Sequence, residues 1–323
     1  MTLFKLKTLI SVFLVFLAAS AFSAEYPNKP IHFIVPFPPG GPADILARII
    51  GPRLTQRLGQ PIIIENRPGA GGNIASDFVA KSNPDGYNLV LGFVGTHAIN
   101  NSLYSSMPYD NVKDFAPIAP IASVTIMLVV HPSVPASSTG ELIELAKSKP
   151  GKLTYGSPGN GTPQHLAGQL FETMAGVDMV HVPYKGAVPA LTDLVGGHLS
   201  MIFSSLPPAL PLINTGKLRG IAVTSLVRSP VSPSIPTISE SGLKGFEIVN
   251  WYGVFAPTGT PKNIIFILNT EIVKIMNSPE VVKILSEQGA VPMTGTPEQF
   301  TTFVKDETNK WAKLVKFSGA RID

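Results

Sequence analysis

Two glycine-rich stretches hold the residues whose types and spacing could do chemistry. In the first, residues 36–44 read PFPPGGPAD. Gly41 can act as an N-cap, Pro42 fits the first helical position, and Asp44 stands where a capping-box acid reaches back. Such a helix start points free backbone N–H groups outward, so it can bind an anion without lysine or arginine. The same residues also fit an ordinary capped helix.

The second stretch, residues 155–165, reads YGSPGNGTPQH. Thr162 followed by proline is a strong helix start. Gly159 and Gly161 let the backbone approach a ligand closely, while Ser157 and Thr162 offer hydroxyl donors. Two such helix starts, one from each half of the chain, could hold one anion from both sides.

Enzyme signatures are weak in the rest of the chain. It has no cysteine, which excludes thiol catalysis and disulfide scaffolds. The stretch RPGAGG at 67–72 lacks the spacing of a dinucleotide fold, and neither a phosphate loop nor an HExxH zinc pair occurs. Ser157 lacks the GxSxG context of a hydrolase nucleophile. We therefore expect no enzyme, no metal site and no cofactor. An exported hydrolase or isomerase stays open as an alternative, with only His97, His165 and Lys185 as reactive groups.

These loops need a scaffold, and the hydrophobic periodicity predicts alternating strands and helices, an α/β fold with parallel sheets covered on both faces. The expected strands are 31–36, 61–65, 88–93, 153–156, 179–182, 199–203 and 218–224. The expected helices are 42–58, 73–81, 142–149, 165–175, 187–195, 262–276, 279–288 and 297–317. Gly51-Pro52 interrupts the first helix, where proline predicts a kink.

Two long extended segments, 117–131 and 246–256, look like crossings between two lobes. We expect lobe one to comprise residues 25–121 and 249–323, and lobe two residues 122–248. Lobe one would then be discontinuous, with the carboxy-terminal helices packing back onto it.

The first 24 residues have the pattern of a secretory signal. Lys5 and Lys7 precede an apolar stretch at 9–19, and small residues follow. Ala19-Ser20-Ala21 fits the A-x-A pattern for cleavage after Ala21, whereas cleavage after Ala24 would put the bulky Phe22 third from the bond. A membrane anchor is the alternative to a cleaved signal. Without Lys5 and Lys7 the chain carries 23 basic and 21 acidic residues, a net charge of +2. That balance argues against nucleic acid as a partner. The mature protein is expected to be soluble, exported to the periplasm and monomeric.

Seven motifs occur in the order typical of one family. They are VPFPPGG, ENRPGAGG, PDGY, KDFAPI, HVPYKG, GKLRGIAVTS and WYGVFAPTGTP, beginning at residues 35, 65, 84, 113, 181, 216 and 251. From Tyr26 to about Ser318 the chain resembles the substrate-binding receptors of tripartite tricarboxylate transporters, the Bug receptor family. The resemblance implies a Venus-flytrap fold, with two α/β lobes, two hinge strands and a small carboxylate in the cleft.

The resemblance also implies which residues surround the carboxylate. By position it implicates Phe37, Gly40, Gly41, Asp44, Ser157, Gly161, Thr162 and His165, to which the loop pattern adds Gly159. Asp44 is expected to order the loop, because an acid beside a carboxylate would repel it. Thr96, His97, Tyr184 and Lys185 are further wall candidates. Ser204 stands where many members have an acid, which predicts a ligand without an ammonium group.

The function expected from the resemblance is a periplasmic receptor that captures a small carboxylate and delivers it to membrane permease subunits. A sensor-type receptor, which presents the carboxylate to a signalling protein, is the alternative. Both use an outer surface of the closed form, so the sequence does not separate them.

Overall fold

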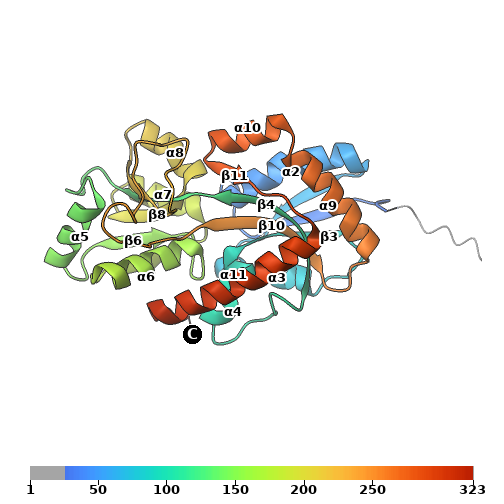
Figure 1. The fold of residues 1–323 in the computed structure, drawn as a ribbon, viewed down its shortest axis with the longest axis horizontal. Helices are drawn as coiled ribbons and strands as arrows, with labels where there is room; N and C mark the ends of the chain where they lie inside the picture. The colour runs from blue at the N-terminus through green and yellow to red at the C-terminus, as the bar shows by residue number, and fades with distance from the viewer. Residues whose placement is uncertain (1–25, 323) are drawn as a thin grey trace, which may run out of the picture.

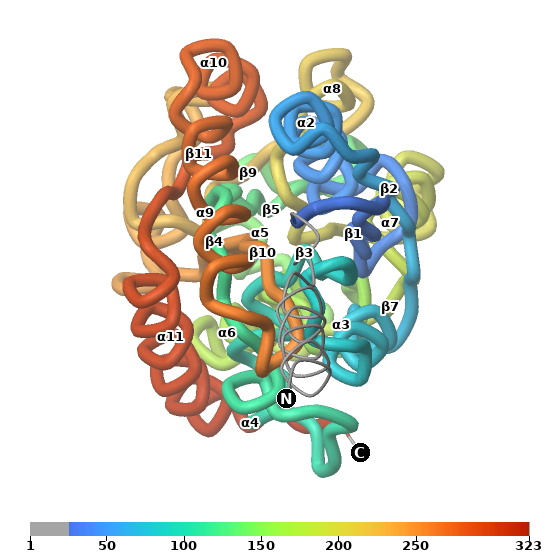
Figure 2. Tube along the Cα trace, turned by 90° about the vertical axis from the view of Figure 1, so that its right-hand side faces the viewer, coloured from blue at the N-terminus to red at the C-terminus, as the bar shows by residue number. Residues whose placement is uncertain are grey.

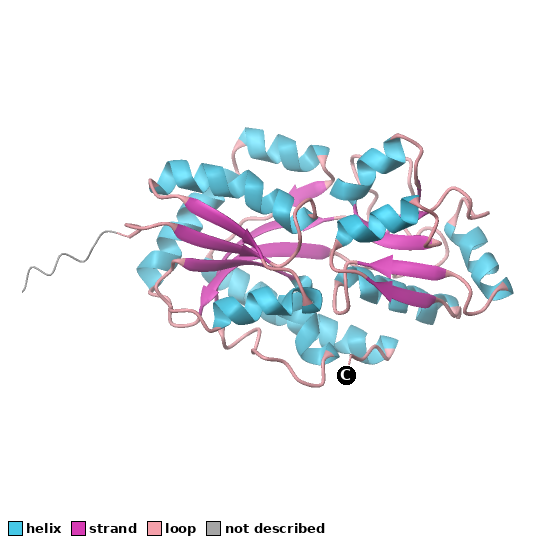
Figure 3. Ribbon diagram, turned by 180° about the vertical axis from the view of Figure 1, so that it is seen from behind, coloured by secondary structure: helices cyan, strands magenta, loops and turns pink. Residues whose placement is uncertain are grey.

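The computed structural model describes residues 26–322, so the predicted secretory signal lies outside the described residues. Two β-sheets lie end to end, with helices on both faces of each (Figures 1 and 3). The first sheet has the order β11-β4-β10-β3-β1-β2, formed by Ala290–Pro292, Phe115–Val124, Asn250–Pro257, Asn88–Phe93, Ile31–Val35 and Ile62–Asn66. The second has the order β7-β6-β8-β5-β9, formed by Val180–Pro183, Thr154–Ser157, Met201–Ser205, Ile126–Val130 and Arg219–Val223.

The helices divide between the two sheets. Those of the first lobe are α2 (Pro42–Leu58), α3 (Asn73–Ala80), α4 (Asn100–Leu103), α9 (Lys262–Met276), α10 (Pro279–Glu287) and α11 (Pro297–Ser318), with the short turns η1 (Ala70–Gly72) and η2 (Gly95–Ile99). Those of the second lobe are α5 (Thr139–Ser148), α6 (Pro163–Ala175), α7 (Ala187–Val195) and α8 (Leu206–Asn214). In the part of the chain that is described, no helix is both long and apolar enough to cross a bilayer.

Each sheet is mixed, which corrects the expectation of parallel sheets. The strands β1, β2 and β3 are parallel, as are β6, β7 and β8. By contrast β10 runs antiparallel to β3 and β4, and β5 runs antiparallel to β8 and β9. The antiparallel pairs arise where the chain passes between the sheets and enters from the opposite end.

The connections between the lobes are short. Thr125 alone separates β4 of the first sheet from β5 of the second, and β10 carries the chain back at Asn250. The long helix α11 contacts β4 and η2 of the first lobe and also α6 of the second. The described chain ends beside α4 (Figure 2), where Ile322 forms a β-bridge with Tyr104.

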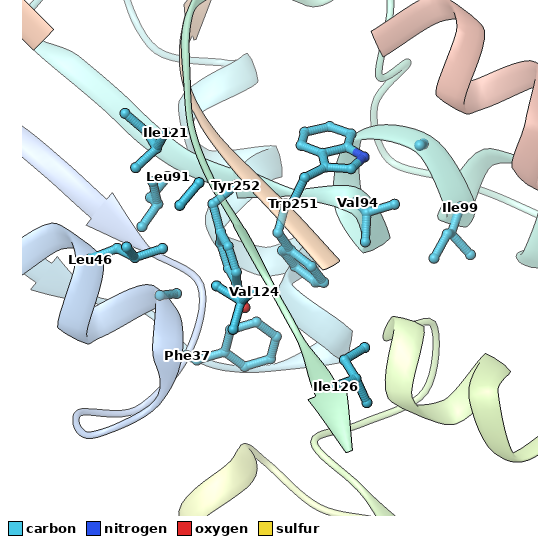
Figure 4. Packing of buried hydrophobic residues seen from close by; sticks show 14 of the residues in the cluster. Phe37, Leu46, Leu91, Val94, Ile99, Ile121, Val124, Ile126, Trp251 and Tyr252 are labelled. Carbon is cyan, nitrogen blue, oxygen red and sulfur yellow. The ribbon is translucent and has the colours of Figure 1, made fainter. Parts of the chain in front are cut away.

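A large hydrophobic cluster extends through both lobes. Its members include Trp251 and Tyr252 of β10, Val124 of β4 and Ile126 of β5, all nearly fully buried (Figure 4). The crossing strands are apolar on both faces because each is covered by helices on either side. The segments that join the lobes are therefore part of the core, and they place the loops at the facing ends of the two sheets.

Most expected elements occur within a few residues of their expected bounds, and α8 is the main omission. Its sequence LPPALPLIN contains three prolines, which argue against a helix, but Pro207 and Pro208 stand in the first turn, where proline is tolerated. Helix α2 is continuous from Pro42 to Leu58 with Pro52 inside it, and the kink expected at this proline stays a prediction.

Candidate functional site

A narrow cavity of about 10 Å³, with room for about one water molecule and partly open to solvent, lies between the two lobes. The first lobe contributes residues from the loop before α2, from the end of β3 and from β10, and the second contributes residues from the starts of α6 and α7. The lining residues are Phe37, Gly41, Pro42, Phe93, Pro158, Gln164, Ala187, Asn250 and Tyr252. None of these nine carries a charged side chain.

Three helices begin at this cavity. Gly41 is the N-cap of α2, Gln164 lies in the first turn of α6, and Ala187 is the first residue of α7. The first N–H groups of a helix have no partner within the helix, and the helix dipole makes that end partly positive. The arrangement can therefore bind an anion from both lobes with main-chain donors alone.

Asp44 holds the loop before α2 in place. Its carboxylate accepts hydrogen bonds from the Gly40 N–H (3.0 Å), from Arg48 Nε (2.8 Å) and from Asn66 Nδ2 (3.0 Å). Asn66 also donates to the Phe37 carbonyl oxygen at 2.8 Å. Burial alone would raise the pKa of Asp44, but the hydrogen bonds from Arg48, Gly40 and Asn66 outweigh it and lower the pKa. Asp44 thus orders the loop, although it bonds Gly40 rather than the N-cap.

Side-chain hydrogen bonds also order the loop before α6. Thr162 caps the helix by accepting from the His165 N–H (3.3 Å) and donates to the Gly159 carbonyl (2.7 Å). The Ser157 hydroxyl accepts from the Gly159 N–H (3.2 Å) and lies 2.7 Å from His181 Nε2. Both hydroxyls are fully buried and engaged within the loop, so their role is to shape it.

Two stacked histidines support this loop from behind. The rings of His165 and His181 lie 4.2 Å apart at 24°, and His165 Nδ1 accepts from the Gly161 N–H at 3.4 Å. Burial lowers the pKa of His165 to about 4. Burial, and then the nearby His165, lower the pKa of His181 to about 3. Both rings are therefore neutral near pH 7, which lets Nδ1 of His165 act as an acceptor.

The wall formed by the first lobe is aromatic with a polar end. Phe37 packs on Phe93 with ring centroids 5.2 Å apart, and Phe93 stacks on Tyr252 at 6.2 Å. Figure 4 shows Phe37 and Tyr252 within the same cluster. At the polar end Asn250 Nδ2 donates to the Tyr252 hydroxyl at 2.7 Å. On the second lobe, Gln164 Nε2 donates to Ser205 Oγ at 3.0 Å.

The lobes are in contact around the cavity. Tyr104 of the first lobe donates to the Asn160 carbonyl of the second at 3.4 Å. At Gly71 there is no room for a side chain, because a Cβ would overlap the same carbonyl oxygen. A Cβ at Gly40 would meet Val188 at 3.3 Å. The structure thus describes the form in which the loops of both lobes surround the cavity.

Phe37 and Gly41 are the predicted site residues that line the cavity. Gly40 lies next to them, and the remaining loop residues stand around or behind the lining. These are Asp44, Ser157, Gly159, Gly161, Thr162 and His165.

The structure places Thr96 and His97 away from the cavity, contrary to the prediction that they form its wall. Both are fully buried in η2, where His97 stacks on Phe255 at 3.8 Å. Burial lowers the pKa of His97 to about 3. The turn after β3 is π-helical and directs these residues into the core, which a strand-end pattern does not reveal.

Three other predicted residues also lie outside the lining. The Tyr184 hydroxyl donates to Asp193 at 2.6 Å, and Lys185 is exposed. Ser204 is fully buried and donates to the Ser205 carbonyl at 3.1 Å. Successive strand residues face opposite sides, so Ser205, not Ser204, bonds the cavity residue Gln164.

Sequence reasoning missed most of the lining. Phe93, Asn250 and Tyr252 come from strands, and Ala187 begins a helix without a side-chain cap. Pro42, Pro158 and Gln164 lie within the two loops that the sequence did single out. The HVPYKG and WYGVF motifs were the available signal for Ala187, Asn250 and Tyr252. Across residues 26–322 no group of three or more histidines or acids is placed to hold a metal ion.

Comparison with known proteins agrees with this geometry. Residues 46–319 match the family described as "Tripartite tricarboxylate transporter family receptor". Protein BugT of Bordetella pertussis is 38% identical over 320 residues, covering 97% of this chain and 98% of BugT.

Two solved structures with a bound or named carboxylate have the same fold. R. palustris Rpa4515 with adipate is 40% identical, has a TM-score of 0.90, and covers 92% of this chain and 100% of its own. MatC from Rhodopseudomonas palustris with bound malate is 32% identical, has a TM-score of 0.86, and covers 90% and 100%. This chain belongs to the receptor family of the tripartite tricarboxylate transporters.

Proposed function

We propose that this chain is a periplasmic receptor that closes its two lobes on a small carboxylate and delivers it to a membrane permease. The observation that carries the proposal is the meeting of three helix N-termini, from both lobes, at one uncharged cavity. Each helix end contributes about 0.3–1 kcal/mol, and each N–H bond to a carboxylate about 1.5–3 kcal/mol. A few of them reach the roughly −8 kcal/mol of micromolar binding.

The ligands named for two structural relatives, adipate and malate, support a dicarboxylate. The lining supports a ligand without an ammonium group, because no acid lines the cavity and Asp44 is engaged by three donors. An ammonium group there would lose its hydration without a charged partner. The expectation first drawn from Ser204 therefore stands on the lining residues instead.

Closure couples the two lobes to the ligand. We take residues 25–121 with 249–323, and residues 122–248, as the units that move, with the crossings near Thr125 and Asn250 as hinges. A ligand that contacts both units favours the closed form by the contacts it makes only there.

The enzyme alternative lacks support in the geometry. His97 and His165 are buried away from the lining, and Lys185 is exposed on the surface. A hydrolase or isomerase would need at least one of them in the cavity with the ligand.

A thermal-shift screen of the mature chain, refolded from denaturant to remove any bound solute, tests the proposal. The panel comprises mono-, di- and tricarboxylates and amino acids. A ligand at about 100 times its Kd adds roughly 2.7 kcal/mol to the free energy of unfolding, a shift of several degrees. A shift with carboxylates alone supports the proposal. Shifts with amino acids and none with dicarboxylates would contradict it.

The partner is tested separately by pull-down from membranes. With the carboxylate identified in the screen, the loaded receptor should retain permease subunits more strongly than the unloaded one. Retention of a sensor protein in their place would support the signalling alternative.

A further inference from the structure

One polar atom in the cavity wall has no partner. Asn250 is 1% exposed and lines the cavity, and its Nδ2 donates to the Tyr252 hydroxyl at 2.7 Å. Its Oδ1 makes no hydrogen bond to any of residues 26–322. A buried acceptor without a donor destabilises the folded state, so a group that donates to it there is favoured.

The neighbouring hydroxyl has the complementary property. Tyr252 also lines the cavity, and its oxygen already accepts from Asn250. Ser205 is the other side chain that hydrogen-bonds this hydroxyl, and it acts as a donor to the oxygen, so the Tyr252 proton remains available for donation. The side chains of Asn250 and Tyr252 thus provide one acceptor and one donor beside each other. The other polar side chain of the lining, Gln164, is engaged with Ser205.

The chemistry of this pair selects among ligand groups. In the amide orientation in which Nδ2 donates to Tyr252, a carboxylate, which only accepts, leaves Asn250 Oδ1 unpartnered, and an ammonium group, which only donates, leaves the Tyr252 proton unpartnered. An aliphatic or phenolic hydroxyl both donates and accepts, so it can satisfy both atoms at once. We propose that Asn250 and Tyr252 recognise a hydroxyl group on the bound solute, which makes the preferred ligand a hydroxycarboxylate. The inference rests on the proposed function, since the helix starts hold the carboxylate.

Matched ligand pairs test this on the refolded mature chain by calorimetry. The pairs are succinate and malate, glutarate and 2-hydroxyglutarate, and benzoate and 4-hydroxybenzoate. In every pair that binds, the hydroxylated member should bind at least about tenfold more tightly, because the other leaves a buried acceptor unpartnered. Equal affinities within the pairs would overturn the inference while leaving carboxylate binding intact. Binding of no pair would overturn the proposed function together with the inference.

Two variants locate the effect. Asn250→Ala should lower the affinity for the hydroxylated member of a pair at least about tenfold more than the affinity for the other member. Tyr252→Phe should bring the two affinities closer together. Tyr109→Phe is the matched control, because Tyr109 is also a buried tyrosine but donates to Asn73 away from the cavity. In Tyr109→Phe the ratio of the affinities for the two members of each pair should equal that of the wild type. If both Asn250→Ala and Tyr252→Phe keep the wild-type ratio of affinities within the pairs, these two residues do not recognise the hydroxyl group. Either variant suffices for the test if the other does not fold.

Discussion

At the scale of single residues, Asp44 stands 3% exposed at the start of α2, with three donors on its carboxylate. The Arg48 guanidinium neutralises it, and the loop N–H that it binds is fixed in place. A buried acid can therefore support an anion site when its own charge is already matched.

Asp44→Ala should weaken carboxylate binding and reduce the free energy of unfolding by about 1–3 kcal/mol, because three donors lose their acceptor. Calorimetry and denaturant unfolding measure the two effects. Asp85→Ala is the control, since Asp85 forms an exposed ion pair with Lys29. Tighter binding in Asp44→Ala would mean that the acid repels the ligand and does not order the loop.

His165 makes stability depend on pH. Its pKa in the folded chain is about 4, below the ordinary 6.5, so the unfolded chain takes up the proton first as pH falls. Its contribution is fully present above pH 6.5 and is lost progressively between pH 6.5 and about 4. His165→Gln should reduce the loss of stability between pH 7 and pH 5 by about 1–2 kcal/mol, measured by denaturant unfolding. An unchanged pH dependence would contradict the buried, neutral state of the ring.

At the scale of elements, the site depends on where helices begin. The starts of α2 and α6 could be predicted because their capping residues are adjacent in the chain. The helix that begins at Ala187 was also predicted from its periodicity, but no nearby residue indicates that its start faces the cavity. The same limit applies to Asn250 and Tyr252, which reach the cavity only because β10 crosses between the lobes. Local signals predict elements well, whereas the far wall of the site is set by tertiary packing.

Thr162→Ala should reduce the free energy of unfolding by about 1 kcal/mol and also weaken ligand binding, because the cap and the bond to Gly159 are both lost. Ser138→Ala removes a similar cap from α5, away from the cavity. It should cost comparable stability and leave the affinity unchanged. Equal effects of both variants on affinity would mean that the loop before α6 plays no part in binding.

At the scale of the whole molecule, the two lobes meet through close backbone approaches as well as through a ligand. Gly71 abuts Asn160, and Tyr104 donates to the same residue, from opposite lobes. The sequence predicted two lobes from two apolar crossings, but these contacts join residues far apart in the chain. They could not be found from local patterns.

Gly71→Ala should weaken ligand binding about tenfold or more, because the added methyl overlaps the Asn160 carbonyl only when the lobes are together. Gly216→Ala is a matched control, since Gly216 also has positive φ (69°, against 61° at Gly71) but no heavy atom lies within 4 Å of the added Cβ. Both variants pay about 1 kcal/mol for the left-handed backbone. In small-angle scattering with ligand, Gly71→Ala should have a larger radius of gyration than Gly216→Ala, because its lobes stay further apart. If Gly71→Ala and Gly216→Ala bind the ligand equally well, the contact between Gly71 and Asn160 plays no part in closure.

The cavity has helix starts on one side and the side chains of Asn250 and Tyr252 on the other. This division affects how the ligand preference of such a receptor can change in evolution. Main-chain amides are retained under almost any substitution that preserves the fold, so the proposed binding of a carboxylate by helix starts does not depend on a few replaceable side chains. Asn250 and Tyr252 lie two residues apart on a single strand. A duplicated copy of this chain can therefore acquire a new nutrient through a few changes on β10, without having to rebuild the site that makes it an acid receptor.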